Sequence, residues 1–216
     1  MTMWHALGRQ LGNPQGLAGA WVGRIMRIAN NRPTRMAVDA LDLHRHEVAL
    51  DLGCGSGHAI ALMAQQALCT YGIDQSAVMV RQAGDRNRAA IRAGRVSVTT
   101  GTFAALPYPD ATFDKILASN VVYFWQDEQA VLAEVRRVLR PGGMLSIYVT
   151  DAATMQHWKF AGSGTHRHFA ASDLTRLLTD AGFGEDAIEV RSVAISRTIQ
   201  GLLATAQHRA HGPALS

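Results

Sequence analysis

Features that mark secreted or membrane-spanning proteins are scarce in this 216-residue sequence. It holds only two cysteines, Cys54 and Cys69, which are too few for a disulfide framework. No apolar run approaches the ~18 residues of a transmembrane helix, and the first residues do not resemble a signal peptide. We therefore expect a cytoplasmic protein with reduced cysteines and no membrane span.

Lysine is also scarce, since Lys115 and Lys159 are the only two and arginine supplies the rest of the positive charge. The formal net charge is only +4, which would suit an anionic substrate, nucleic acid or lipid headgroups but is too small to choose among them, and an ordinary solvated basic surface is favoured over all three. The arginines are scattered along the chain, and no nucleic-acid-binding module is visible. We therefore expect no nucleic-acid partner. Hydrophobic residues make up 48% of the chain, enough for a buried core.

Short apolar segments alternate with helical ones from residue 47 onwards. Strands are predicted at residues 47–53, 69–74, 95–101, 113–120 and 144–151, and helices at 58–68, 76–94 and 127–143. Beyond them we expect a helix at 171–183, with Ser172 as N-cap and Gly182 as stop, and strands at 188–195 and 201–207 as an antiparallel edge. This α/β alternation predicts a doubly wound, mostly parallel, seven-stranded sheet with helices on both faces.

An acidic residue and three alternating glycines end the first predicted strand, as Asp51-Leu52-Gly53-Cys54-Gly55-Ser56-Gly57. Such a turn lets a ligand lie against bare backbone. A phosphate-binding P-loop is excluded because no lysine follows. The dinucleotide fingerprint requires its third glycine one residue later, where His58 stands. Since a carboxylate repels pyrophosphate, Asp51 favours a cationic ligand, such as an ammonium or sulfonium.

Other polar and aromatic residues follow the next predicted strands. Asp74 ends the second strand and could accept hydrogen bonds from ribose hydroxyls, which indicates a nucleoside. Thr102 and Phe103 follow the third strand, and Asn120 closes the fourth. Because the carboxyl ends of parallel strands form one edge, we expect these residues to line one ligand site. Tyr123, Phe124 and Trp125 come next and could serve either packing or a pocket.

Four motifs in this order carry a resemblance that covers roughly residues 46–185. They are VALDLGCGSG, YGID, GTFAALPYPDATFDKILASN and LRPGGMLSIY. The sequence resembles the class I S-adenosylmethionine-dependent methyltransferases, most of all those of small metabolites, quinones and lipids. The resemblance implies a Rossmann-like fold, S-adenosylmethionine as cofactor, and methyl transfer to an oxygen, nitrogen or carbon of a small molecule. No metal is expected, because His166 and His168 have no cysteines or acids nearby at ligand spacing.

The resemblance also implies roles for individual residues. Asp51, Gly53 and Gly55 would surround the methionine part of the cofactor, within a turn that Cys54 and Gly57 complete. Asp74 would bind the ribose, Gln75 and Phe103 would flank the adenine, and Asn120 would lie beneath the sulfonium. Relatives usually carry aspartate where this chain has Thr102, so its hydroxyl should accept more weakly from the adenine amino group.

Catalytic residues are less evident, because positioning alone can drive methyl transfer from a good leaving group. Weak candidates for a general base are Tyr123, His157, His166 and His168. The fourth strand ends in SNVVYFW and lacks the Asn/Asp-Pro-Pro-Tyr/Phe signature of enzymes that methylate nucleobase amino groups. Three alternatives stay open: a membrane-associated lipid or quinone acceptor, a non-catalytic cofactor-binding relative, and an NAD-dependent oxidoreductase.

The segment before the first strand bears on the acceptor. We divide the chain into a helical extension at residues 1–45 and the cofactor-binding domain at 46–216. Residues 16–43 are predicted to be helical, with a break near Arg32-Pro33. This basic, amphipathic segment could lie on a lipid surface or close over the cofactor as a lid. As a lid it would wall the acceptor pocket, together with Tyr123 and Trp125, through Trp21, Met26, Asn30, Asn31 and Met36.

Overall fold

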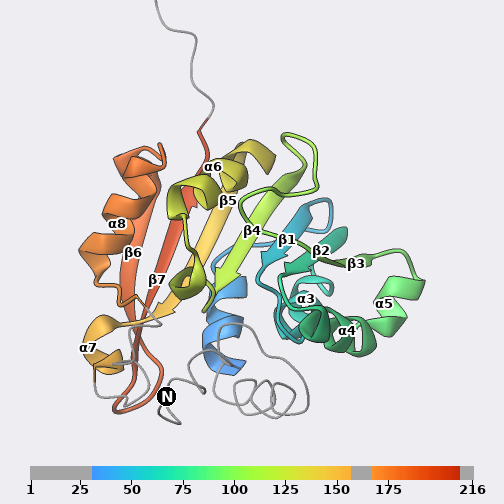
Figure 1. Cartoon of the computed structure of the whole chain (residues 1–216), viewed down its shortest axis with the longest axis horizontal. Helices are drawn as coiled ribbons and strands as arrows, with labels where there is room; N and C mark the ends of the chain where they lie inside the picture. The colour runs from blue at the N-terminus through green and yellow to red at the C-terminus, as the bar shows by residue number, and fades with distance from the viewer. Residues whose placement is uncertain (1–30, 157–166, 210–216) are drawn as a thin grey trace, which may run out of the picture.

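The computed structural model of this protein describes residues 31–156 and 167–209. These residues form a seven-stranded sheet with the order β3-β2-β1-β4-β5-β7-β6 (Figure 1). The strands are β1 (Val48–Leu52), β2 (Cys69–Asp74), β3 (Val96–Thr100), β4 (Phe113–Ser119), β5 (Leu139–Thr150), β6 (Ile188–Ala194) and β7 (Gln200–Gln207). Strands β1 to β5 pair in parallel, whereas β7 is antiparallel to both β5 and β6. The predicted doubly wound sheet with an antiparallel edge is confirmed.

Helices cover both faces of this sheet. They are α3 (His58–Met63), α4 (Ala77–Arg86), α5 (Arg88–Arg92), α6 (Glu128–Val138), α7 (Ala152–Met155) and α8 (Ala171–Asp180), with 3-10 turns η1 (Val122–Phe124) and η3 (Glu185–Ala187). Residues 31–39 are helical as well. They pack with α3 on one face, where Ala49 and Leu117 point, while α6 and α8 pack on the other, where Leu50 and Ile116 point. Side chains alternate between the faces of a strand, so apolar runs such as β1 and β4 suit a sheet that is covered twice.

Several details of the predicted helices are wrong. The helix predicted at 127–143 ends at Val138, and residues 139–143 belong to β5. Residues 76–94 form two helices, because buried Asn87 ends α4 and begins α5 while its side chain donates to the carbonyls of Gly57 and Ala83. Residues 31–39 are helical, Pro33 included; the residues before 31 lie outside those described, so the break expected near Arg32-Pro33 stays a prediction. Ala170, rather than Ser172, is the N-cap of α8.

The Ala170 N–H donates to the Asp173 carboxylate, so a side chain inside the first turn replaces the missing cap. The predicted stop is confirmed: α8 ends at Asp180, and Gly182 follows with a φ of +83°.

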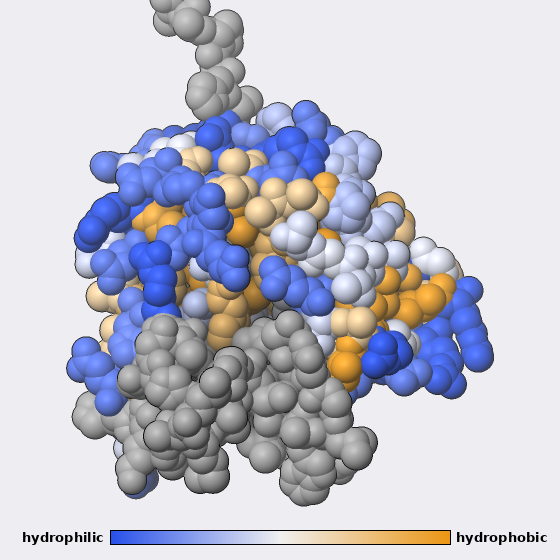
Figure 2. Space-filling view, in the orientation of Figure 1, coloured by the Kyte–Doolittle hydropathy of each residue, from blue (hydrophilic) through white to orange (hydrophobic). Residues whose placement is uncertain are grey.

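No helix in the described ranges is both long and apolar enough to cross a bilayer. Figure 2 shows hydrophilic residues over much of one face and more apolar ones toward α4 and α5. Leu68 is the one large hydrophobic residue among those described that is exposed.

Candidate functional site

The glycine turn between β1 and α3 has an unusual backbone. Gly53, Gly55 and Gly57 have φ angles of +79°, +49° and +75°, in the left-handed region that favours glycine. The turn is tied to β2, because the Gly53 and Cys54 N–H groups both donate to the Ile73 carbonyl, at 2.8 and 3.0 Å. The glycines that the sequence singles out are therefore required by the backbone itself.

The three glycines differ in what surrounds them. A Cβ on Gly53 would lie 2.3 Å from Val121 Cγ2, and one on Gly57 would lie 2.8 Å from Ala83 Cβ. A Cβ on Gly55 would meet no atom within 4 Å. Gly53 and Gly57 thus allow close packing of the turn, whereas Gly55 leaves open space above it.

Two carboxyl groups flank this turn. Asp51 in β1 is 2% exposed, and its Oδ2 atom has no hydrogen-bond partner among the described residues. Burial, and after it the nearby charge of Asp74, raises the pKa of Asp51 from its ordinary value of 3.8 to about 8. An unpartnered buried carboxyl is costly, so this group indicates a site that a ligand completes.

Asp74 is the last residue of β2 and is better satisfied. The Gly55 and Ser76 N–H groups each donate to one of its carboxylate oxygens at 2.8 Å. Burial raises the pKa of Asp74, and these two hydrogen bonds oppose the rise. Each oxygen keeps a second lone pair, so the carboxylate can still accept hydrogen bonds from hydroxyls.

The ends of β3 and β4 complete this edge of the sheet. After β3, Thr102 is exposed and Phe103 is buried in the main apolar cluster, while Gln75 after β2 is exposed. Asn120 follows β4 with a φ of +56°, and its N–H donates to the Tyr148 carbonyl at 2.8 Å. Because β3, β2, β1 and β4 are neighbours, the predicted cofactor-binding residues all lie at one edge.

The charge and shape of this edge select the kind of ligand. Asp51 and Asp74 disfavour a phosphate here, because an anion would raise the pKa of both carboxyl groups further, whereas an ammonium or sulfonium would favour their ionised forms. The open space at Gly55 lies beside Asp74, which Gly55 contacts directly. The residues present therefore fit a cationic nucleoside such as S-adenosylmethionine.

Comparison with known proteins agrees with this chemistry. Residues 50–147 match the sequence profile of the family described as "Methyltransferase domain". This match supports a class I S-adenosylmethionine-dependent methyltransferase. Methyltransferase GfsG of Streptomyces halstedii is 36% identical over 120 residues, which cover 55% of this chain and 43% of that relative. The 27-O-demethylrifamycin SV methyltransferase of Amycolatopsis mediterranei (strain S699) is 35% identical over 120 residues, which cover 55% and 44%.

The chain thus spans less than half the length of these two curated relatives. A solved methyltransferase of Haloferax volcanii, in complex with the Trm112 methyltransferase activator, superposes with a TM-score of 0.76 at 21% identity. The match covers 90% of this chain and 96% of that one. At this identity the superposition supports the fold alone.

The other predicted site residues are more dispersed. Tyr123 is buried and hydrogen-bonded to Asn120, and Trp125 is 5% exposed within the main apolar cluster. His168 is half-buried, and its Nε2 atom has no partner in the part of the chain that the structure describes. Asn31 is exposed, whereas Met36 packs against the cluster that holds Tyr148 and Leu203. Trp21, Met26, Asn30, His157 and His166 lie outside the described residues.

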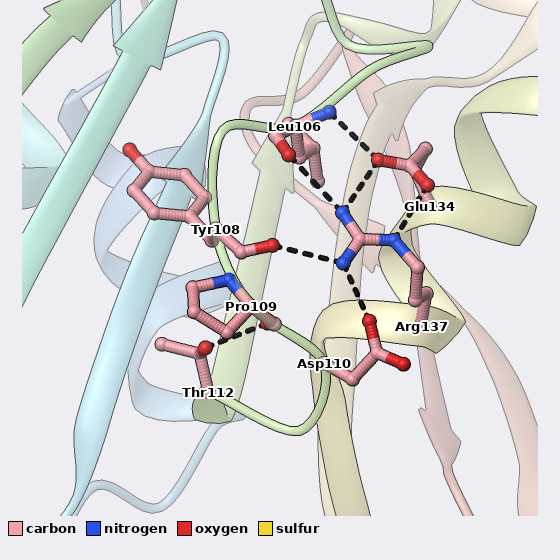
Figure 3. A network of polar contacts seen from close by, with 7 residues as sticks. All are labelled: Leu106, Tyr108, Pro109, Asp110, Thr112, Glu134 and Arg137. Carbon is pink, nitrogen blue, oxygen red and sulfur yellow. Dashed lines mark hydrogen bonds and ion pairs between the residues drawn. The ribbon is translucent and has the colours of Figure 1, made fainter.

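A network around Arg137 of α6 was not foreseen (Figure 3). Its guanidinium donates to Glu134 at 2.7 and 2.8 Å, to Asp110 at 2.7 Å, and to the carbonyls of Tyr108 and Leu106 at 2.8 and 3.1 Å. Glu134 in turn accepts from the Leu106 N–H at 2.7 Å. The network anchors the segment after β3 to α6. Only the i,i+3 spacing of Glu134 and Arg137 could have suggested part of it.

Proposed function

We propose that this chain binds S-adenosylmethionine and transfers its methyl group to an oxygen, nitrogen or carbon of a small-molecule acceptor. The observation that carries the proposal is the buried, unpartnered carboxyl of Asp51 beside the open Gly55. The family supports the cofactor, and the two named methyltransferase relatives support the reaction class. When bound, the cofactor would supply a methyl group on a positively charged sulfonium.

The residues of the site have distinct parts in this proposal. Asp51 would offset the positive charge of the methionine part, against the turn formed by Gly53, Cys54, Gly55 and Gly57. Asp74 would hold the ribose hydroxyls through its remaining lone pairs. Gln75, Thr102 and Phe103 would flank the adenine, and Asn120 would lie next to the reacting centre. The free thiols of Cys54 and Cys69 support a cytoplasmic location.

Calorimetric titration with S-adenosylmethionine tests the cofactor. The wild-type chain should bind, and Asp51→Ala should abolish detectable binding while the protein stays folded, because the cation loses its counter-charge. The control is Asp173→Ala, which removes a carboxylate that accepts from the Ala170 N–H and pairs with Arg176 of α8. Retained affinity in Asp51→Ala would show that the glycine turn has been misinterpreted.

The acceptor needs a separate experiment. The chain is incubated with methyl-labelled S-adenosylmethionine and a cell extract that is then split into polar and lipid fractions. We expect label in the polar fraction, as for a soluble metabolite, with none in the Asp51→Ala reaction. Label in the lipid fraction would instead identify a lipid or quinone acceptor, and no label in either would contradict methyl transfer.

A further inference from the structure

The Tyr123 hydroxyl joins the ends of two neighbouring parallel strands. Tyr123 lies in η1 and is buried, with 8% of its surface exposed. Its oxygen accepts the N–H of Thr150, the last residue of β5. Its proton is donated to Oδ1 of Asn120, directly after β4, at 3.4 Å. The hydroxyl therefore ties the Asn120 side chain to the backbone of β5.

Asn120 is held from several directions. Its φ of +56° is left-handed, and its N–H donates to the Tyr148 carbonyl at 2.8 Å. The next residue, Val121, packs against Gly53, so Asn120 adjoins the glycine turn. A carboxamide has one acceptor oxygen and one NH₂ donor group. With Oδ1 engaged by Tyr123, the NH₂ group faces away from Tyr123.

We propose that Tyr123 is a positioning residue whose hydroxyl fixes the Asn120 carboxamide, so that its NH₂ group donates to an acceptor atom of the bound cofactor. Suitable acceptors are a ribose oxygen or the carboxylate of the methionine part. This inference rests on the proposed function, because it requires a cofactor at the edge formed by β1 and β4.

The same contacts argue against Tyr123 as a general base. Its oxygen already accepts the Thr150 N–H, and its proton is committed to Asn120. Burial also raises the pKa of Tyr123 above its ordinary value, so the phenolate is disfavoured further. Tyr123 would thus act through Asn120 and not on the acceptor.

A double-mutant cycle tests the coupling. Tyr123→Phe and Asn120→Gly, where glycine tolerates the left-handed φ, should each weaken S-adenosylmethionine binding about 5- to 20-fold. The double variant should bind no more weakly than Asn120→Gly alone, because the inference has Tyr123 affect the cofactor only through Asn120. Multiplied losses in the double variant would show that Tyr123 acts independently of Asn120 and would overturn the inference.

Tyr148→Phe is the matched control. Tyr148 is also buried near the end of β5, and its hydroxyl bonds to the Thr150 side chain, not to Asn120. This variant should lose stability yet keep wild-type affinity for S-adenosylmethionine. An equal loss of affinity in Tyr148→Phe would assign the effect to general packing and overturn the inference.

A readout without ligand separates this inference from the proposed function. In ¹H–¹⁵N spectra, the Asn120 side-chain NH₂ signals should be dispersed in the wild-type chain and collapse toward the exposed-amide position in Tyr123→Phe. Unchanged signals would overturn the positioning role even if the chain binds the cofactor. If the wild-type chain bound no S-adenosylmethionine, the proposed function and the donation to the cofactor would fail together. Collapsed signals would then still establish that Tyr123 fixes the amide.

Discussion

Gly53 and Gly55 lie two residues apart in one turn, yet a side chain is excluded for different reasons at the two positions. Gly53→Ala should lower the free energy of unfolding by about 2–4 kcal/mol, because it adds a Cβ 2.3 Å from Val121 Cγ2 at a φ of +79°. Gly55→Ala adds a methyl group to open space and should cost only ~1 kcal/mol through its left-handed φ. Its main effect should be weaker S-adenosylmethionine binding.

Gly94→Ala provides the control for this pair. Gly94 has a φ of +70° and open space around its Cα, but it lies between α5 and β3, at the start of β3 and away from the site. Urea unfolding should give similar losses for Gly55→Ala and Gly94→Ala, and calorimetry should show weaker binding only for the former. Wild-type affinity in Gly55→Ala would mean that the ligand does not use the space at this glycine.

The site was predictable at the residue scale where it depends on local spacing. Asp51, the three glycines and Asp74 follow directly from strand ends and turn geometry. The link from Tyr123 to Asn120 and Thr150 was not, because it joins two strands that the chain separates by a whole helix. Trp125, a candidate for the pocket from sequence, lies in the core, since the burial of an aromatic residue depends on what packs around it.

At the scale of elements, one side chain of α6 fixes the segment after β3. Arg137→Met should lower the free energy of unfolding by about 1–3 kcal/mol, because two carbonyls and the Glu134 carboxylate lose their donor. Hydrogen exchange of amides in residues 104–112 should accelerate in this variant. Tyr108 should loosen with the segment, because its carbonyl loses the hydrogen bond from Arg137. The edge-on contacts of its ring with Tyr71 and Phe113 should weaken as a result.

Arg176→Met is the matched change on α8. Arg176 is 69% exposed and forms an ion pair with Asp173 at 3.5 Å, so its loss should cost at most about 0.5 kcal/mol. Equal losses for both arginines would mean that solvent screens the Arg137 network as fully as a surface pair. The largest cause of the lowered pKa of Glu134 is its hydrogen bond from Arg137. This supports a larger loss of stability for Arg137→Met than for Arg176→Met.

The elements themselves were predicted well where apolar runs are bounded by glycine or polar residues. Strand β2 occupies the predicted residues 69–74, and β1, β3 and β4 differ only at their ends. The errors came from tertiary contacts. Asn87 divides a continuous helical pattern because its amide reaches the carbonyl of Gly57 in another element. β5 begins at Leu139, earlier than predicted, because Leu139 pairs with Phe113 across the sheet.

At the scale of the whole molecule, folding and cation binding favour opposite protonation states of Asp51, which lies near Asp74. The folded chain holds the Asp51 proton up to a pKa of about 8, whereas the unfolded chain loses it near the ordinary value of 3.8. The stability contributed by this proton is therefore fully present below about pH 4 and is lost as pH rises through about 8. A bound cation favours the ionised carboxylate and so requires the proton to leave.

S-adenosylmethionine should accordingly stabilise the chain more at pH 9 than at pH 6. Below about pH 8, each unit by which the pH falls should weaken binding by up to about tenfold, or ~1.4 kcal/mol, because the ligand must displace a proton from Asp51. Thermal unfolding with and without ligand measures this, and calorimetry in buffers of different ionisation enthalpy should detect proton release near pH 7.

Asp51→Asn removes the titrating group while keeping the shape of the side chain. At pH 9 the wild-type chain carries a buried charge on Asp51 that the variant lacks, so the variant should be the more stable of the two. It should show little ligand stabilisation at either pH. If the ligand stabilised the wild-type chain equally at pH 6 and pH 9, Asp51 would already be ionised at pH 6. That outcome would contradict the raised pKa of Asp51. Wild-type affinity in Asp51→Asn would instead contradict its role as counter-charge, because the variant keeps the shape of the buried side chain and loses only the charge.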